Sequence, residues 1–329
     1  MQRWEKVSNL TVVRSKAGDD DIEGPVSWAI NRLDSVQLAT GEGVMSEGVA
    51  TGWRGRLSAW WTILRIALEE RLVYRGDFAL GTLMRFLPII TQIFLWWAVF
   101  ETVPVGSDGR SRLVGYGFSD MVAYYFLTML GRAFSSMPGL ATGIARQIRD
   151  GEVKKYLVQP IDMLGFLFWA RVAHKLAYYS VAAIPFGMVF FLCRGYFEQG
   201  WPAMPYLVAF IASLLMAFLL GFLVEACLGL VGFWMLEISS LLFLYMLFSF
   251  FLSGHMFPLD MLPQPIATIV NFLPLKYLAY FPATVFLEKV PIDRLGWELL
   301  VQALWTLLFF FLARTMYQRG VRRYSGFGG

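Results

Sequence analysis

The stretch MPYLVAFIASLLMAFLLGFLVEACLGLVG, residues 204–232, decides the fold class. It holds one charged residue, Glu225, and it is longer than the roughly 20 residues that a helix needs to cross a hydrocarbon layer of about 30 Å. Of the 329 residues of the chain, 57% are hydrophobic and 16% are charged, whereas soluble proteins are about half apolar and a quarter charged. We therefore predict an all-α membrane protein rather than two soluble domains.

Further apolar runs of similar length lie on both sides of this stretch. They are continuous, which favours helices over the alternating strands of a membrane barrel, because a spanning backbone must satisfy its own hydrogen bonds. We predict six spanning helices, at about 78–100, 118–140, 164–192, 204–232, 238–257 and 296–316.

The start of the chain has a different composition. Residues 1–53 are rich in acids and bases and lack the basic start, apolar core and small-residue cleavage site of a secretory signal. We interpret them as a polar, largely disordered cytoplasmic extension, and residues 54–329 as one six-span membrane domain.

An amphipathic pattern begins at Leu57, before the first predicted span. Tryptophans at headgroup depth and arginines on the wet face are typical of a helix lying in the membrane surface. A helix packed on a soluble domain is the alternative, but no sizeable soluble domain is available to receive it. The side chains assigned to this interfacial helix are Trp60, Trp61, Leu64, Arg65, Leu68 and Arg71.

The distribution of Lys and Arg predicts the orientation. If the N-terminus is cytoplasmic, thirteen basic residues flank the spans on the inside and six on the outside, as the positive-inside rule requires. We therefore expect both termini in the cytoplasm and the chain in the plasma or inner membrane.

The connection between the fifth and sixth predicted spans cannot be one helix, because prolines interrupt it. Short half-helices dipping into the outer leaflet are the natural interpretation, since irregular backbone at that depth needs protein or water to cover it. The prolines are Pro258, Pro263, Pro265, Pro274, Pro282 and Pro291.

The motifs that are missing exclude several functions. The sequence has no phosphate-cradling G-x-x-x-x-G-K-[ST] loop, no H-E-x-x-H and no G-x-S-x-G. Cys193 and Cys227 both lie in or beside apolar runs and cannot build a disulfide framework or a thiolate metal site. Basic residues are scattered instead of gathered with aromatics, which argues against nucleic-acid binding. We predict no catalytic, cofactor or metal site, so any ATP energy must come from a partner.

The spans contain several ionisable side chains, and three of them are the candidates for an intramembrane polar site. Arg132, Lys175 and Glu225 would each cost roughly 2.5–3.5 kcal/mol at the bilayer centre, so they need partners or water. Lys175 lies near the cytoplasmic end of its span and can snorkel. Glu225 belongs to a ridge of small residues that repeats every four positions and lets another helix approach closely. A pair between Glu225 and either Arg132 or Lys175 stays open, as does a fold-fixing role against a substrate or proton role.

The fifth predicted span is rich in aromatic residues. Tyr245, Phe248 and Phe251 are candidates for lining a path for an amphiphilic ligand. The alternative is that these rings face lipid or pack within the bundle.

The order of these elements resembles the membrane subunit of a type-2 ATP-binding cassette (ABC) exporter. The segment IRDGEVKKYLVQPID (148–162) is similar to the most recognisable stretch of that family, an Ile-Arg-x-Gly-Glu core followed by Leu-x-x-Pro and a polar residue. The sequence departs from it at Gln159, where an arginine often precedes the proline, and in the extension 1–53. The similarity covers residues 54–329 in topology.

This resemblance implies a permease that pairs with a second copy or a sister permease in the lipid membrane and docks two ATPase subunits, which hold ATP and Mg²⁺. Glu237 would be a smaller second contact with the ATPase, and Leu57–Arg75 the connecting helix. A basic loop attracted to anionic lipid is the alternative. The main coupling helix would be formed by Arg146, Gln147, Ile148, Arg149, Asp150, Gly151, Glu152, Val153, Lys154 and Lys155.

The expected function is therefore export of an unidentified substrate, for which the aromatic and Met-rich spans hint at a hydrophobic or amphiphilic cargo. An ion-driven secondary transporter or channel is the alternative. Many secondary transporters have two matching broken segments, one in each half of the sequence. Here the first half contains no segment that matches 258–291, which argues against this alternative.

Overall fold

The computed structural model describes residues 87–105, 111–158, 162–197, 200–235 and 237–324, all within one compact unit, Gly48–Gly329. The extension 1–53, the interfacial helix and the start of the first predicted span lie outside these residues. So do Gln159 and the proline that follows it.

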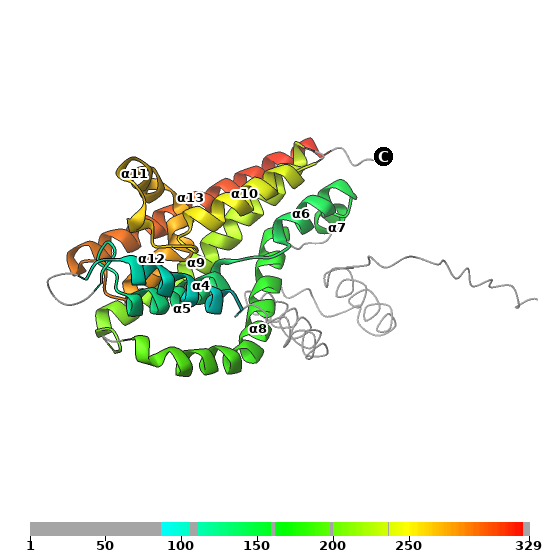
Figure 1. Cartoon of the computed structure of the whole chain (residues 1–329). Coiled ribbons are helices and arrows are strands. Elements are labelled where there is room, and N and C mark those ends of the chain that lie inside the picture. The colour runs from blue at the N-terminus through cyan, green and yellow to red at the C-terminus, as the bar shows by residue number, and fades with distance from the viewer. Residues whose placement is uncertain (1–86, 106–110, 159–161, 198–199, 236, 325–329) are drawn as a thin grey trace, which may run out of the picture. The chain divides into compact units, whose positions relative to one another are not determined.

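The described residues are mostly helical and contain no β-strand, apart from two isolated bridges (Figure 1). Four short 3-10 helices, η1 (Arg194–Tyr196), η2 (Val231–Phe233), η3 (Leu259–Met261) and η4 (Pro274–Leu278), join or extend the α-helices. The α-helices are α4 (Leu87–Thr102), α5 (Phe118–Ser135), α6 (Leu140–Arg149), α7 (Lys154–Val158), α8 (Met163–Cys193), α9 (Met204–Leu230), α10 (Ser239–Leu252), α11 (Gln264–Phe272), α12 (Tyr280–Phe286) and α13 (Ile292–Arg323).

Two of these helices are long and apolar enough to cross a membrane, namely α9 with its extension η2, and α13. A third results if α8 is one span, although α8 bends by 52° between Met163–Ser180 and Ala182–Tyr196. Pro185 explains the bend, because a proline removes the hydrogen bond to the carbonyl four residues earlier and its ring displaces that carbonyl. These lengths and compositions confirm a helical, multi-pass membrane protein, and the count of six spans stays a prediction.

Two helices end earlier than the apolar runs that contain them. α5 stops at Ser135, five residues before the predicted end, because Pro138 disfavours helical backbone before it and Gly139 takes a left-handed φ of 73°. α10 stops at Leu252 for a similar reason, since Gly254 has a φ of 75°.

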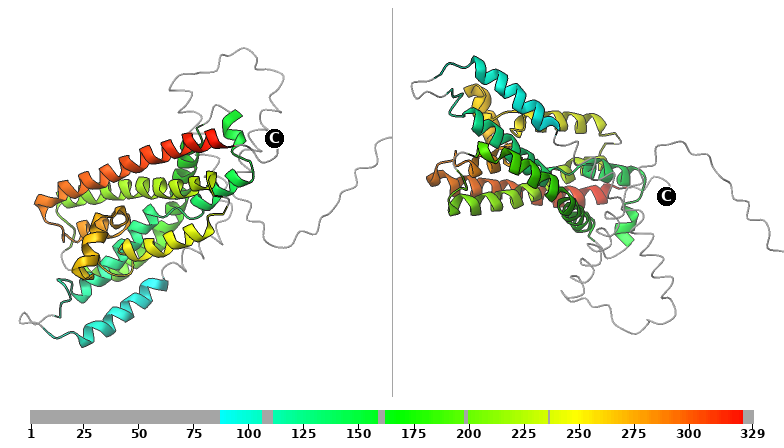
Figure 2. Two further views of the ribbon diagram at one scale, coloured as in Figure 1. Left: turned by 90° about the horizontal axis from the view of Figure 1, so that it is seen from above. Right: turned by 60° about the horizontal axis from the view of Figure 1, so that its bottom comes forward.

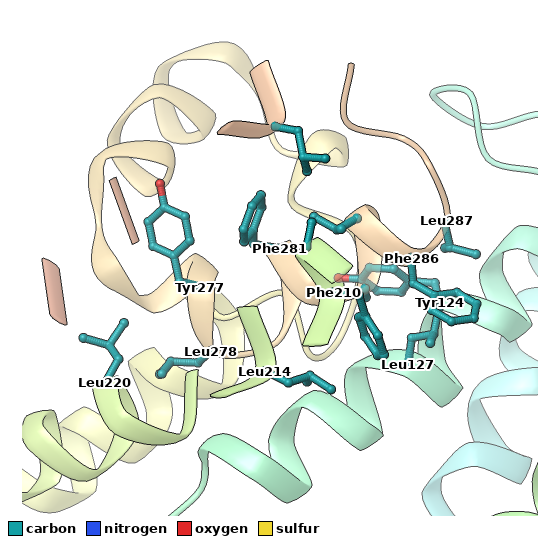
Figure 3. Packing of buried hydrophobic residues seen from close by; sticks show 14 of the residues in the cluster. Tyr124, Leu127, Phe210, Leu214, Leu220, Tyr277, Leu278, Phe281, Phe286 and Leu287 are labelled. Atoms are coloured by element: carbon teal, nitrogen blue, oxygen red, sulfur yellow. The ribbon is translucent and has the colours of Figure 1, made fainter. Parts of the chain in front are cut away.

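α9 lies at the centre of the packing. It contacts α5, α6, α12 and α13, and α13 runs alongside it in both views of Figure 2. Lipid tails are as apolar as leucine, so these helices associate through close fit and not through exclusion from water. The labelled side chains of the shared core (Figure 3) are Tyr124, Leu127, Phe210, Leu214, Leu220, Tyr277, Leu278, Phe281, Phe286 and Leu287.

The segment between α10 and α13 is broken into short helices, and prolines stand at the breaks, as the sequence predicts. Pro258, Pro263 and Pro291 are the N-cap residues of η3, α11 and α13. Polar contacts tie this segment to its neighbours. The Lys276 ammonium lies 2.9 Å from the Glu298 carboxylate of α13, and the Lys289 ammonium lies 2.8 Å from the Asp120 carboxylate of α5.

Candidate functional site

The candidate site is the α6–α7 segment, residues 140–158, which connects α5 to α8. Leu140, Ala141, Ile144 and Ile148 are buried, and their helical spacing places them on one face, with which α6 packs on α9 and η2. The opposite face carries Arg146 and Arg149 into solvent. The segment is therefore anchored by one side and open on the other.

The predicted coupling helix over 146–155 needs correction. These residues are not one helix, because α6 ends at Arg149 and α7 begins at Lys154. Gly151 causes the turn between them with a φ of +81°, a value that other residues rarely adopt. The helical part of the segment is 140–149, and the Asp150-Gly151 turn forms its tip.

Opposite charges face one another around this tip. Arg146 Nε and Arg149 Nε lie 3.6 Å and 3.4 Å from the Asp150 carboxylate, and Lys155 Nζ lies 3.0 Å from the Glu152 carboxylate. Ion pairs that are this exposed contribute about 1 kcal/mol or less to folding. They shape the exposed surface without being needed for the fold, so a partner can engage them at little cost.

The second predicted contact, Glu237, lies beside the first. Its carboxylate is 3.8 Å from the Arg149 guanidinium. Hydrogen bonds from the Ser239 hydroxyl and the Ser239 amide lower the pKa of the Glu237 carboxyl below its usual range, and Arg149 adds to this effect. The structure therefore joins two sequence positions almost ninety residues apart into one exposed surface, the α6–α7 segment with Glu237.

The C-terminal end of α13 lies beside the tip. The Tyr324 hydroxyl lies 3.5 Å from where a Cβ on Gly151 would be, and the Tyr324 ring packs edge-on against Phe233 at 5.9 Å. A larger residue at Gly151 would therefore meet Tyr324 as well as an unfavourable φ.

Four backbone residues, Ser136–Gly139, form the break between α5 and α6, and side chains of α8 bind its carbonyl groups. Lys175 Nζ donates to the Ala133 and Ser136 carbonyls, the latter at 2.7 Å. The Tyr179 hydroxyl also donates to Ala133, and Arg171 donates to Pro138, both at 2.9 Å. Cations here complement the negative end of the α5 dipole and satisfy carbonyls that the helix leaves free.

Glu225 binds the other side of the same break. Its Oε1 accepts a hydrogen bond from the Met137 amide at 3.2 Å, next to the start of α6. A carboxylate is favourable at a helix N-terminus. Lys175 and Glu225 thus hold opposite sides of one break, which we call the α5–α6 clamp. Lys175 is 7% exposed, so it does not snorkel as predicted.

Glycines of α9 bring the backbones close enough for this clamp. A Cβ at Gly221 would overlap the Ser135 carbonyl oxygen, and one at Gly229 would lie 2.8 Å from the Ala141 carbonyl oxygen. These positions belong to the predicted small-residue ridge. The prediction that the ridge admits a neighbouring helix, with Glu225 in the contact, is confirmed, and α5 with α6 is that neighbour.

Arg132 does not pair with Glu225. No hydrogen bond or ion pair within 4 Å joins its guanidinium to any residue in the described part of the chain. Its carbon Cζ lies 5.9 Å from the centre of the Phe250 ring of α10, and Glu225 and Tyr245 lie within electrostatic range.

The three candidate pathway residues of α10 differ in how far they are exposed. Tyr245 is half-buried and packs against the core, whereas Phe248 and Phe251 are 54% and 42% exposed. Phe250, one position away from Phe251, lies beside Arg132 and His255.

The sequence did not predict an ion pair that lies just after the α6–α7 segment. Arg314 of α13 lies 2.5 Å from Asp162, whose other oxygen caps α8 by accepting from the Gly165 amide at 2.7 Å. The cap had a local signal, an acid just before an apolar run. The partner 152 residues away had none.

The described residues include no group of three His, Cys, Asp or Glu side chains placed to hold a metal ion.

A family model described as ABC-2 family transporter protein matches residues 86–328, which include every described residue. The chain belongs to the ABC-2 transporter family. Comparison with curated proteins gave no match. Membership confirms the resemblance to a type-2 permease membrane subunit. An ABC-2 permease is the membrane component of a transporter, is not itself the catalyst, and in general associates with an ABC ATPase.

Proposed function

We propose that the chain is the permease subunit of an ATP-driven ABC exporter in the plasma or inner membrane. It moves a hydrophobic or amphiphilic substrate out of the cytoplasm, and separate ATPase subunits that bind ATP and Mg²⁺ supply the energy. The six spans are α4, α5, α8, α9, α10 and α13, and both termini are cytoplasmic. Family membership supports the permease assignment, and the details are part of the proposal.

The ATPase docks on the α6–α7 segment and Glu237. The observation that carries this assignment is that the segment is anchored by a buried apolar face and turns an exposed face of mixed charge outward. The surface also has exposed apolar side chains, Leu157 of α7 at 47% and Met235, two residues before Glu237, at 54%. A surface with an apolar part and a charged rim is typical of a protein interface.

The α5–α6 clamp carries movement of that surface into the membrane. Lys175, Arg171 and Glu225 bind the backbone at the break instead of leaving it to water. A force on α6 therefore reaches α5, α8 and α9 through hydrogen bonds, and it displaces the spans that enclose the substrate.

A second copy or a sister permease, together with lipid, covers the remaining apolar faces. α4 and α10 present many exposed large side chains, among them Phe94 at 63% and Phe243 at 61%. In a soluble protein, apolar surface of this extent would mark an interaction site.

Uncoupling variants test the proposal. Gly151→Val and the double change Arg149→Glu with Glu152→Lys should lower export by about tenfold while ATP hydrolysis by the complex continues, since coupling between sites is typically about 1–3 kcal/mol. Arg294→Glu, which reverses an exposed charge at the start of α13, is the matched control. Unchanged export in both uncoupling variants would remove the docking assignment.

Co-purification separates this function from the alternative, an ion-driven secondary transporter or channel. A stoichiometric ATPase in the detergent extract supports the exporter. A chain that purifies alone and shows ion-driven flux in vesicles supports the alternative.

A further inference from the structure

From the contacts of α5 with α10, we infer that Arg132, Phe250 and His255 form a recognition site for the acidic group of an amphiphilic substrate, a carboxylate or a phosphate. We call these three residues the Phe250 site. The inference rests on the proposed function and adds the substrate class to it.

The guanidinium of Arg132 is an unusual group in this setting. It lies in an apolar helix of a membrane protein, and within the described ranges no hydrogen bond or ion pair within 4 Å satisfies it. A charge in such surroundings is costly unless something pairs with it. The guanidinium carbon lies 5.9 Å from the centre of the Phe250 ring, whose face attracts a cation but offers no acceptor oxygen.

Capping of the C-terminus of α5 does not explain the position of Arg132. The side chain is in the last turn of the helix, where a cation often binds terminal carbonyls. Those carbonyls are taken by Lys175 and Tyr179, which donate to Ala133 and Ser136. Arg132 is free to point elsewhere, and it points to α10.

A second polar group meets the same ring. The His255 imidazole lies edge-on to Phe250 with 5.2 Å between the ring centres. Its Nδ1 is buried and has no hydrogen-bond partner among the described residues. Two nitrogen groups that can donate hydrogen bonds therefore flank one ring, and both lack an acceptor. An acidic group is the ligand that satisfies both at once, because arginine binds carboxylate and phosphate through two parallel hydrogen bonds.

Within the described ranges, no carboxylate lies within 4 Å of the Arg132 guanidinium. α10 contains no acidic residue, so a second copy packed on the same helix face brings none, and the one acid of α4 is Glu101, in its last turn. Asp120 of α5 is paired with Lys289, and Glu225 binds the Met137 amide. The described acids near the site are thus engaged elsewhere, which leaves the Arg132 guanidinium open to the acidic group of a ligand.

The surroundings explain why that ligand is an amphiphile. Phe250 is 37% exposed, and its neighbours Met246 and Phe251 are 61% and 42% exposed, so the site opens onto an apolar surface. A hydrocarbon tail packs along α10 while the acidic group reaches Arg132. The opposite charge and the apolar contact together select for a lipophilic acid over a neutral or cationic compound.

Binding of a fluorescent probe tests the inference. The full chain in phosphatidylcholine nanodiscs is titrated with a dansyl-labelled fatty acid and with its methyl ester. We expect tight binding of the acid and at least about tenfold weaker binding of the ester. Arg132→Gln should weaken binding of the acid by about tenfold or more, or about 1.4 kcal/mol, and leave the ester unchanged. Arg132→Lys should fall between, because lysine keeps the charge without the planar fork.

Arg194→Gln is the matched control. Its guanidinium also lies over a phenylalanine ring, Phe191 at 4.3 Å, but at the end of α8, and binding should change by less than about twofold. Equal binding of acid and ester, or equal losses in the Arg132 and Arg194 variants, would overturn the inference. Displacement of the probe by phosphatidylglycerol would assign the site to a bilayer lipid and overturn the substrate class.

The proposed function fails in a different way. If the wild-type chain never retains an ATPase, the exporter assignment is wrong whatever the probe does. If Arg132→Gln retains the ATPase and an unchanged elution profile, and acid and ester bind alike, only the substrate class is wrong.

Discussion

α9 and α10 are both runs of apolar residues, yet the structure treats them in opposite ways. Fourteen of the 27 residues of α9 are buried, compared with one, Ser249, of the 14 residues of α10. The difference lies in the small residues. α9 carries Gly221 and Gly229 at its contacts with α5 and α6, whereas α10 presents a dense series of phenylalanine, leucine and methionine side chains outward.

This contrast teaches that hydropathy and packing are separate properties in a membrane protein. Hydropathy reports whether a helix tolerates lipid, and small residues report which helices meet. We therefore expect α9, which carries Glu225 of the clamp, to keep its position during transport. We expect α10, whose side chains are exposed, to contact a ligand or a second copy or to move.

The largest expected effect compares two phenylalanines. Phe210 of α9 is 7% exposed and packs edge-on against Phe286 at 5.0 Å, so Phe210→Ala should destabilise the fold by about 3–5 kcal/mol. Phe248→Ala on the exposed face of α10 should change the free energy of unfolding by less than about 0.5 kcal/mol. Unfolding by SDS in mixed micelles measures both. Similar losses would show that α10 is packed as tightly as α9.

The next prediction compares two helical glycines. Gly221→Ala should lower the free energy of unfolding by about 1–3 kcal/mol, because the new methyl group overlaps the Ser135 carbonyl. Gly187→Ala of α8, where a Cβ would meet nothing within 4 Å, should raise it by about 0.5–1 kcal/mol, because alanine loses less backbone freedom. Effects of the same sign would contradict the close approach of α9 to α5.

The last prediction concerns the clamp, and its expected effect is similar to that of Gly221→Ala. Lys175→Met leaves two backbone carbonyls without this donor and should cost about 1–3 kcal/mol. Lys154→Met, at an exposed position of α7, is the control and should cost almost nothing. Export should fall in the first variant at a temperature where both are folded. If it does not, the clamp holds the fold without transmitting movement.

The sequence predicted the helical membrane fold, the proline breaks and the polar segment after α5, because hydropathy, proline and charge act locally. Its small-residue ridge also predicted a close neighbour for α9. What local patterns could not give was the identity of partners. Lys175 was expected to snorkel or to pair with Glu225, and Glu225 was expected to pair with Lys175 or Arg132. Instead, Lys175 and Glu225 bind opposite sides of the break at Ser136–Gly139.

The helix bounds of the α6–α7 segment also could not be predicted from hydropathy and charge. Its charges and its turn signal at Asp150-Gly151 were visible in the sequence, but its helix was placed too far along the chain. α6 begins at Leu140 because Pro138 and Gly139 break α5 there, and this break fell inside a run that looked continuous by hydropathy alone.

The most direct test of the account is the side of the membrane on which the tip of the α6–α7 segment lies. The two native cysteines, Cys193 and Cys227, are buried, so a single cysteine in Asp150→Cys is the thiol that a membrane-impermeant maleimide reaches. The account predicts labelling from the cytoplasmic side only, and protection of that thiol when the ATPase is bound. Labelling from the exterior alone would contradict it.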